Sequence, residues 1–148
     1  MRTLRVLFVC IGNAYRSQMA EGLARRLGSD VLVAESAGLS PTMTVPEVVV
    51  RLMKEKGIDI SSQFPKAVAS LDVRSYDLVV NMTGLNINSL PSSSSRTWEV
   101  GDPVGQKDDV VRATRDKIEA LVMGLILELR GMREEWEKPK LRSKLRGV

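Results

Sequence analysis

The stretch that decides the fold is LRVLFVC, Leu4–Cys10, followed by the short loop IGNAY and then by RSQMAEGLARRL, which ends at Leu27. The first segment is an almost continuous apolar run, as is typical of a parallel strand buried on both faces. Gly12 and Asn13 interrupt this pattern, and from Ser17 to Leu27 the apolar residues return at helical spacing. We therefore expect a buried strand, a tight loop and a helix, with the only cysteine of the chain at the end of the strand.

The same alternation continues along the chain. We expect further strands at residues 31–34, 76–82 and 97–100, and further helices at residues 46–56 and 108–130. Strands that alternate with helices predict an α/β fold of three layers, in which helices cover both faces of a four-stranded parallel sheet. Ligands bind beyond the carboxyl ends of the strands in such sheets. The first of these strand ends carries Cys10.

The length of 148 residues suits a single domain, which we place at residues 1–131, followed by a basic and flexible tail at 132–148. The net charge of +4 belongs to this tail, because residues 138–148 hold five basic side chains and no acidic one, leaving 17 basic against 18 acidic residues elsewhere. Aromatic residues make up only 4% of the chain, which disfavours base stacking and hence nucleic-acid binding. No apolar run approaches the roughly 20 residues that span a bilayer. We expect a cytoplasmic protein with no nucleic-acid or membrane partner.

The chain has one cysteine and no histidine. This count excludes an internal disulfide, a zinc site built from Cys and His ligands, and every mechanism that relies on a histidine base. A carboxylic acid is then the natural proton donor for any hydrolytic step.

The loop from Cys10 to Ser17 combines features that favour an anion. Backbone N–H groups between a strand and a helix N-terminus form a concave anion site. The helix dipole and Arg16 both favour the thiolate form of Cys10, and the planar guanidinium can bind an oxyanion at two points. A lone buried cysteine is more often an inert apolar residue, but the strand before it and the Arg-Ser pair after it indicate a nucleophile.

The chain resembles the low-molecular-weight protein tyrosine phosphatase superfamily, which includes the thioredoxin-coupled arsenate reductases. The signature of that superfamily is C-x5-R-S after a hydrophobic strand, and here it reads VLFVCIGNAYRSQMAEG. The similarity continues through ESAG at 35–38, GIDIS at 57–61, YDLVV at 76–80 and Asp102-Pro103, so it spans about residues 4–130. The resemblance implies the four-stranded parallel sheet, with the phosphatase loop after its first strand.

The resemblance also implies residue roles. Cys10 would be the nucleophile, Arg16 would bind the oxyanion, and Asp102 would protonate the leaving oxygen and then activate water. Oxyanion binding would use Ile11, Gly12, Asn13, Ala14, Tyr15, Arg16 and Ser17, while Asn13, Ser17 and Ser36 would hold the loop in shape. No cofactor or metal is expected. Glu21 matches a position near a cation site in some of the reductases, but Gln63 and Pro65 do not fit that site.

Two sets of departures bear on the substrate. Val104-Gly105 replaces the tyrosine pair of the phosphotyrosine enzymes, and Gln18 replaces a proline, and both changes resemble the reductases. However, Thr83 and Leu90 stand where those reductases carry resolving thiols, and Tyr15 replaces a second loop cysteine.

We therefore predict a cysteine-dependent phosphatase of the phosphotyrosine type, which hydrolyses a phosphate monoester or phosphoprotein through a phosphocysteine intermediate. The alternative is an arsenate reductase that takes arsenate and an external thiol. A third hypothesis is a regulatory module that binds an oxyanion without turnover.

Overall fold

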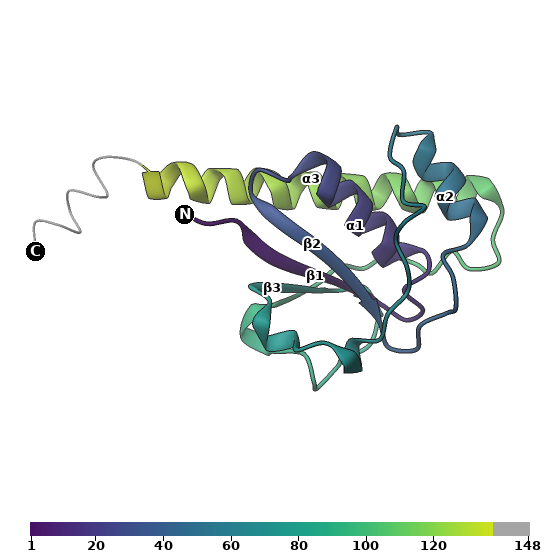
Figure 1. Cartoon of the computed structure of the whole chain (residues 1–148), viewed down its shortest axis with the longest axis horizontal. Coiled ribbons are helices and arrows are strands. Elements are labelled where there is room, and N and C mark those ends of the chain that lie inside the picture. Colours follow the sequence, from purple (N-terminus) through teal and green to yellow (C-terminus); the bar gives the residue numbers. More distant parts are fainter. Residues whose placement is uncertain (138–148) are drawn as a thin grey trace, which may run out of the picture.

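The computed structural model describes residues 1–137 (Figure 1). Its elements are β1 (Leu4–Cys10), α1 (Arg16–Leu27), β2 (Leu32–Gly38), α2 (Glu47–Lys54), the 3₁₀ helices η1 (Val68–Ser70) and η2 (Val73–Ser75), β3 (Leu78–Asn81), η3 (Ser92–Ser94), β4 (Ser95–Thr97) and α3 (Asp108–Glu137). The four strands form one parallel sheet in the order β2-β1-β3-β4. The predicted α/β fold with a four-stranded parallel sheet is therefore confirmed.

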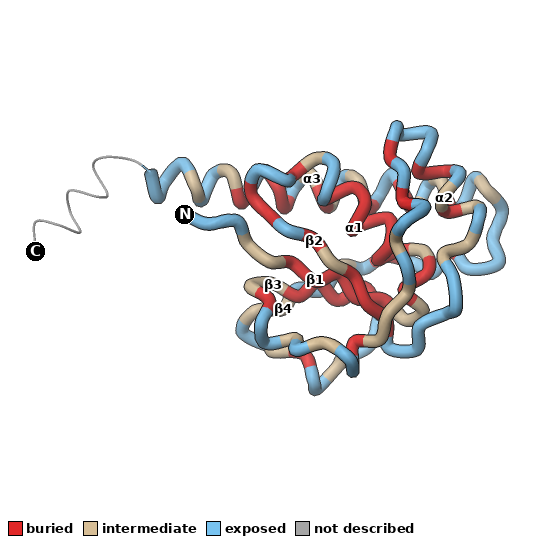
Figure 2. The backbone as a smooth tube through the Cα atoms, viewed as in Figure 1, coloured by how far each residue is buried: buried red, intermediate tan, exposed pale blue. Residues whose placement is uncertain are grey.

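The two faces of the sheet are covered differently (Figures 1 and 2). Val6, Phe8 and Cys10 face a large core that is completed by α1, α2 and α3. Leu7 and Val9 face a smaller core that is closed by η1, η2 and the segment before β4. The helices on this second face, η1 and η2, are thus 3₁₀ helices of three residues each, whereas the first face is covered by α-helices.

The bounds of three strands differ from the predicted ones. β3 is shorter than the predicted 76–82, since it pairs only over Leu78–Asn81. β2 continues to Gly38, because it pairs with β1 along its full length, from Leu4 opposite Leu32 to Cys10 opposite Gly38. β4 lies at Ser95–Thr97, earlier than the predicted 97–100. Trp98 follows it and packs its ring against Phe8, with ring centroids 5.7 Å apart. Aromatic packing in the core explains the apolar signal that suggested a strand there.

The last helix is longer than predicted. Residues 132–137, which the sequence assigns to a flexible tail, form the final turns of α3. Arg130 and Arg133 on α3 both hydrogen-bond to Asp30, which anchors this end of the helix. The rest of the predicted tail, residues 138–148, lies outside the described residues. None of the helices within residues 1–137 combines the length and the apolar character of a membrane span.

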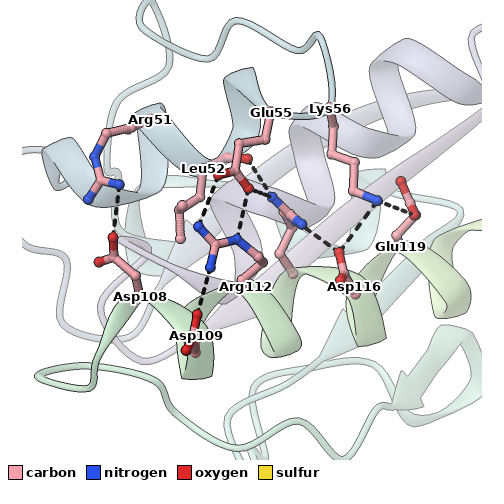
Figure 3. A network of polar contacts seen from close by, with 10 residues as sticks. Arg51, Leu52, Glu55, Lys56, Asp108, Asp109, Arg112, Asp116 and Glu119 are labelled. Carbon is pink, nitrogen blue, oxygen red and sulfur yellow. Dashed lines mark hydrogen bonds and ion pairs between the residues drawn. The ribbon is translucent and has the colours of Figure 1, made fainter.

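Ion pairs fasten α2 to the N-terminal half of α3 (Figure 3). Glu55, just after α2, binds Arg112 and Arg115 at 2.9 and 2.7 Å, and Arg51 binds Asp108 at 2.9 Å. Hydrogen bonds from the two arginines lower the pKa of Glu55 to about 2. The residues just before α2 and just before α3 both line the pocket described next, so this network fixes two of its walls.

Candidate active site

A pocket of about 250 Å³ opens at the carboxyl end of β1. It brings together the three residues that the sequence assigns to catalysis, although they are up to 92 positions apart in the chain. Its lining consists of Cys10, Gly12, Ala14, Tyr15, Arg16, Thr42, Thr44, Pro46, Asp102 and Val104. The thiol lies at the floor, since Cys10 is only 2% exposed.

The backbone of the loop is fixed by hydrogen bonds to its carbonyl groups. Those of Cys10, Ile11 and Gly12 accept from the N–H groups of residues 39, 40 and 42 at 3.2, 2.9 and 3.0 Å. The Asn13 carbonyl accepts from the Gln18 side chain at 2.9 Å. A trans peptide points its carbonyl and the following N–H in opposite directions. The N–H groups of residues 11–14 therefore face the inside of the loop, where an anion would be bound.

Asn13 is the centre of the hydrogen bonds that hold the loop. It is fully buried and adopts the left-handed conformation, with φ at 50°. Its Nδ2 donates to Ser17 Oγ at 2.7 Å and to Ser36 Oγ at 2.9 Å, and its Oδ1 accepts from the Lys66 N–H at 2.9 Å. Of the three residues predicted to support the loop, Asn13 thus hydrogen-bonds directly to the other two.

Ser17 connects this network to the thiol. Its Oγ lies 2.9 Å from Cys10 Sγ. Because the same oxygen already accepts from Asn13, the hydroxyl proton is free to be donated to the sulfur. A hydrogen bond in that direction stabilises a thiolate.

Arg16 is buried, and its guanidinium spans three segments. Nη1 donates to the carbonyls of Met82 and Val100 at 2.7 and 3.1 Å, and Nη2 lies 3.5 Å from Asp102 Oδ2. That single carboxylate is itself 47% exposed. Within residues 1–137, Asp102 is the carboxylate paired with this buried guanidinium, and its exposure leaves Arg16 able to bind an oxyanion in the pocket.

Asp102 stands at the pocket mouth. Its Oδ1 accepts from the Val104 N–H at 3.1 Å, while Pro103 beside it is buried. The buried proline and this short turn orient the carboxyl group above the loop, beside Arg16.

The positions that carry resolving thiols in the thioredoxin-coupled reductases do not reach this pocket. The Thr83 hydroxyl donates to Asn81 Oδ1 at 2.7 Å, and Leu90 is buried in the smaller core. Both side chains thus have structural partners in this chain.

Sequence reasoning missed several residues that shape the site. Thr42, Thr44 and Pro46 form a wall, and only their place after a strand end pointed to it. Gly38 was visible in the sequence as the last residue of ESAG at 35–38, and the structure explains the glycine, because a Cβ there would lie 2.8 Å from the Asn13 nitrogen and the Ile11 oxygen. Lys66 was also missed, because it holds Asn13 through its backbone N–H, which every residue except proline offers.

The described residues hold no group of three or more His, Cys, Asp or Glu side chains placed to bind a metal ion.

Comparison with known proteins agrees with this geometry. The family pattern described as low molecular weight phosphotyrosine protein phosphatase matches residues 5–135. A glutaredoxin arsenate reductase from Synechocystis sp. is 34% identical over 129 residues, covering 84% of this chain and 98% of that protein.

Solved structures of both activities are similar to this chain. An arsenate reductase in the phosphate binding state is 34% identical with a TM-score of 0.78, covering 86% of this chain and 99% of that one. The YwlE arginine phosphatase from Geobacillus stearothermophilus is 25% identical with a TM-score of 0.83, covering 91% and 98%. The chain belongs to the low-molecular-weight phosphotyrosine protein phosphatase family, which includes arsenate reductases.

Proposed function

We propose that this chain is an arsenate reductase that relies on an external small thiol, with Cys10 as its only internal thiol. This reading reverses the order of preference that the sequence suggests. Relatives with arsenate reductase activity in their names match most of this chain. Within the site, the observation that carries the proposal is the wall after Asp102 and before α2, where Val104, Thr42, Thr44 and Pro46 stand and no tyrosine pair flanks the pocket. The aromatic ring in the lining, that of Tyr15, belongs to the loop itself and not to this wall.

The first step uses the loop, Arg16 and Asp102. The inward N–H groups and the guanidinium bind the arsenate oxygens, and the Cys10 thiolate attacks arsenic. An As–O bond breaks, and Asp102 supplies the proton with which that oxygen leaves as water. The product is a covalent S–As(V) adduct on Cys10.

The second step needs two electrons from outside the chain. The thiolate of a small thiol attacks Cys10 Sγ, the S–As bond breaks, and its electron pair reduces As(V) to As(III), which leaves as arsenite. A second small thiol then attacks the mixed disulfide and releases the Cys10 thiolate. In sum, two thiols become one disulfide while one arsenate becomes arsenite and one water.

Hydrolysis of phosphate monoesters at the same site is the second candidate, and the lone thiol favours it. Here Cys10 attacks phosphorus, Asp102 protonates the leaving alkoxide or phenoxide, and the same carboxylate activates the water that cleaves phosphocysteine. This route consumes no reductant, so it needs no thiol besides Cys10.

One pair of assays separates the two candidates. Arsenate reduction is measured with glutathione, mycothiol or thioredoxin, and p-nitrophenyl phosphate hydrolysis is measured on the same preparation. We expect reduction with a small thiol to exceed hydrolysis. Hydrolysis without reduction would replace the proposal by the phosphatase. Oxyanion binding with neither reaction would leave the regulatory module, and full activity of Cys10→Ser would refute the site.

A further inference from the structure

Behind the loop lies a buried carboxylate that the proposed reaction does not use. The Glu21 side chain on α1 is only 3% exposed. Its Oε1 accepts from the Ser36 hydroxyl at 2.7 Å, and Ser36 in turn accepts from Asn13. A buried carboxylate is costly unless cations and hydrogen bonds compensate its charge. The cations that compensate the charge of Glu21 therefore bear on the loop, because Glu21 is connected to Asn13 through Ser36.

Each oxygen of the Glu21 carboxylate has a different cation beside it. Arg25, whose side chain is half exposed, lies 3.3 Å from Oε2. Lys66 Nζ lies 3.8 Å from Oε1, the same oxygen that accepts from Ser36. Among the described residues, Lys66 is thus the cation beside the oxygen that is connected through Ser36, Asn13 and Ser17 to Cys10.

Lys66 is also attached to the loop by its backbone. Its N–H donates to Asn13 Oδ1 at 2.9 Å, and its carbonyl accepts from the Gly38 N–H at 2.8 Å. The ammonium is 5.1 Å from the centre of the Phe64 ring, and the side chain is 23% exposed. One residue therefore contacts Asn13 directly and, through Glu21 and Ser36, indirectly.

We propose that Lys66 is a positioning residue whose tethered ammonium fills a cation site behind the loop. It holds Glu21 Oε1 against Ser36, which keeps Asn13 and Ser17 in place to donate toward the Cys10 sulfur. The proposal rests on the proposed function insofar as Cys10 is the reacting thiolate. It implies that the protein needs no free cation at this site, and that removing the lysine side chain would make its thiol depend on one.

The test combines Lys66→Ala with chemical rescue. Alkylation of Cys10 by iodoacetamide and turnover are both measured in ammonium, methylammonium and tetramethylammonium chloride at equal ionic strength. We expect Cys10 of Lys66→Ala to be alkylated about tenfold more slowly than in the unaltered protein. The reason is that a displaced Ser17 hydroxyl would no longer stabilise the reactive thiolate, and small displacements of a supporting group lower reactivity strongly. Ammonium and methylammonium should restore the rate, whereas tetramethylammonium is too bulky and has no N–H to donate.

Three controls make the result specific. Lys66→Arg keeps a cation and should stay near the unaltered rate. Lys117→Met removes an exposed lysine on α3 and should change neither rate nor cation dependence. The double variant Lys66→Met with Glu21→Gln removes both charges but keeps an oxygen for Ser36, and should alkylate faster than Lys66→Met alone.

Two results would overturn the proposal. One is alkylation of Lys66→Ala at the unaltered rate. The other is a folded but slow Lys66→Ala that neither small cation restores, which would make the lysine a structural residue only. If Lys66→Ala does not fold, the double variant decides, and the same slow alkylation in it and in Lys66→Met would refute the proposal. Alkylation needs no substrate, so its outcome is independent of whether the protein reduces arsenate.

Discussion

Asp102 is the most exposed of the three residues proposed to act on the substrate, and its carboxyl group makes no hydrogen bond to either of the other two. Replacement by asparagine keeps an oxygen for the Val104 N–H and removes the acid. We expect Asp102→Asn to lower kcat by about 10²–10⁴-fold, both for arsenate reduction and for any hydrolysis of phosphate monoesters, because this is the usual contribution of a general acid. The loss should shrink for aryl phosphates whose leaving group needs no proton, which a series of substituted phenyl phosphates measures. An equal loss across the series would mean that Asp102 has another role.

At the residue scale, sequence reasoning found the side chains whose chemistry is distinctive and missed the contacts made by the backbone. Cys10, Arg16 and Asp102 are identifiable because thiol, guanidinium and carboxyl groups have few substitutes. Lys66 and Thr42 bind the loop through their backbone N–H groups, which donate to Asn13 Oδ1 and to the Gly12 carbonyl. Every residue except proline has such a group, so the residue type does not reveal the contact. The three-dimensional path of the chain was needed to find them.

At the scale of elements, β2 and the loop lie so close together at Gly38 that any side chain there would clash with the loop. A methyl group there would meet backbone atoms of Asn13 and Ile11, which cannot rotate away as a side chain can. We expect Gly38→Ala to destabilise the fold by about 1–3 kcal/mol, as overpacking does, and to lower activity by moving the loop. Urea unfolding followed by circular dichroism measures the first effect.

A matched substitution distinguishes this clash from a general effect of losing a glycine. Gly124 lies within α3, and a Cβ there would meet no atom within 4 Å apart from its chain neighbours and the nearby backbone of α3 itself. Gly124→Ala should therefore raise stability by about 0.5–1 kcal/mol through helix propensity. Equal destabilisation by both variants would contradict the steric explanation.

The ion pairs between α2 and α3 predict an acid-sensitive contact. Because the folded pKa of Glu55 is about 2, below its ordinary value of 4.5, the charged form favours the folded state. Its contribution is present above pH 4.5 and is lost as the pH falls toward 2. Glu55→Gln should thus lower the melting temperature at pH 7, with a difference that narrows from pH 5 to pH 2.

The control for this titration is Glu134→Gln, an exposed carboxylate elsewhere on α3. Its melting temperature should follow the unaltered protein across the range. A constant difference between Glu55→Gln and the unaltered protein from pH 7 to pH 2 would show that the carboxylate charge contributes nothing.

Elements with strong local patterns were predictable, and those that depend on distant partners were not. β1 and the start of α3 follow from apolar runs and helical spacing. The extra length of β2 arises from its register with β1, and the last turns of α3 arise from the bonds to Asp30, 100 positions away for Arg130. Neither cause is visible within a local window.

At the scale of the whole molecule, the chain has one thiol, so the proposed mixed disulfide on Cys10 can be reduced only by a second thiol from outside the chain. If arsenate is reduced as proposed, rapid acid quenching during turnover with glutathione should trap one glutathione per chain, on Cys10. Intact-protein mass spectrometry followed by peptide mapping measures this adduct, and Cys10→Ser is the control. Turnover without any adduct, under conditions that retain disulfides, would argue against attack of the external thiol on Cys10.

The buried guanidinium of Arg16 has a consequence for screening. It joins the end of β3, the residues after β4 and the start of α1 through two carbonyls and a carboxylate. An oxyanion that binds this guanidinium would therefore stabilise the folded state against thermal unfolding. Saturation at a hundred times Kd stabilises a protein by about 2.7 kcal/mol, and each kcal/mol raises the melting point of a chain of this size by about 2–4 °C. Ranking arsenate, phosphate, sulfate and vanadate by thermal shift would then report the preference of the pocket before any turnover is observed.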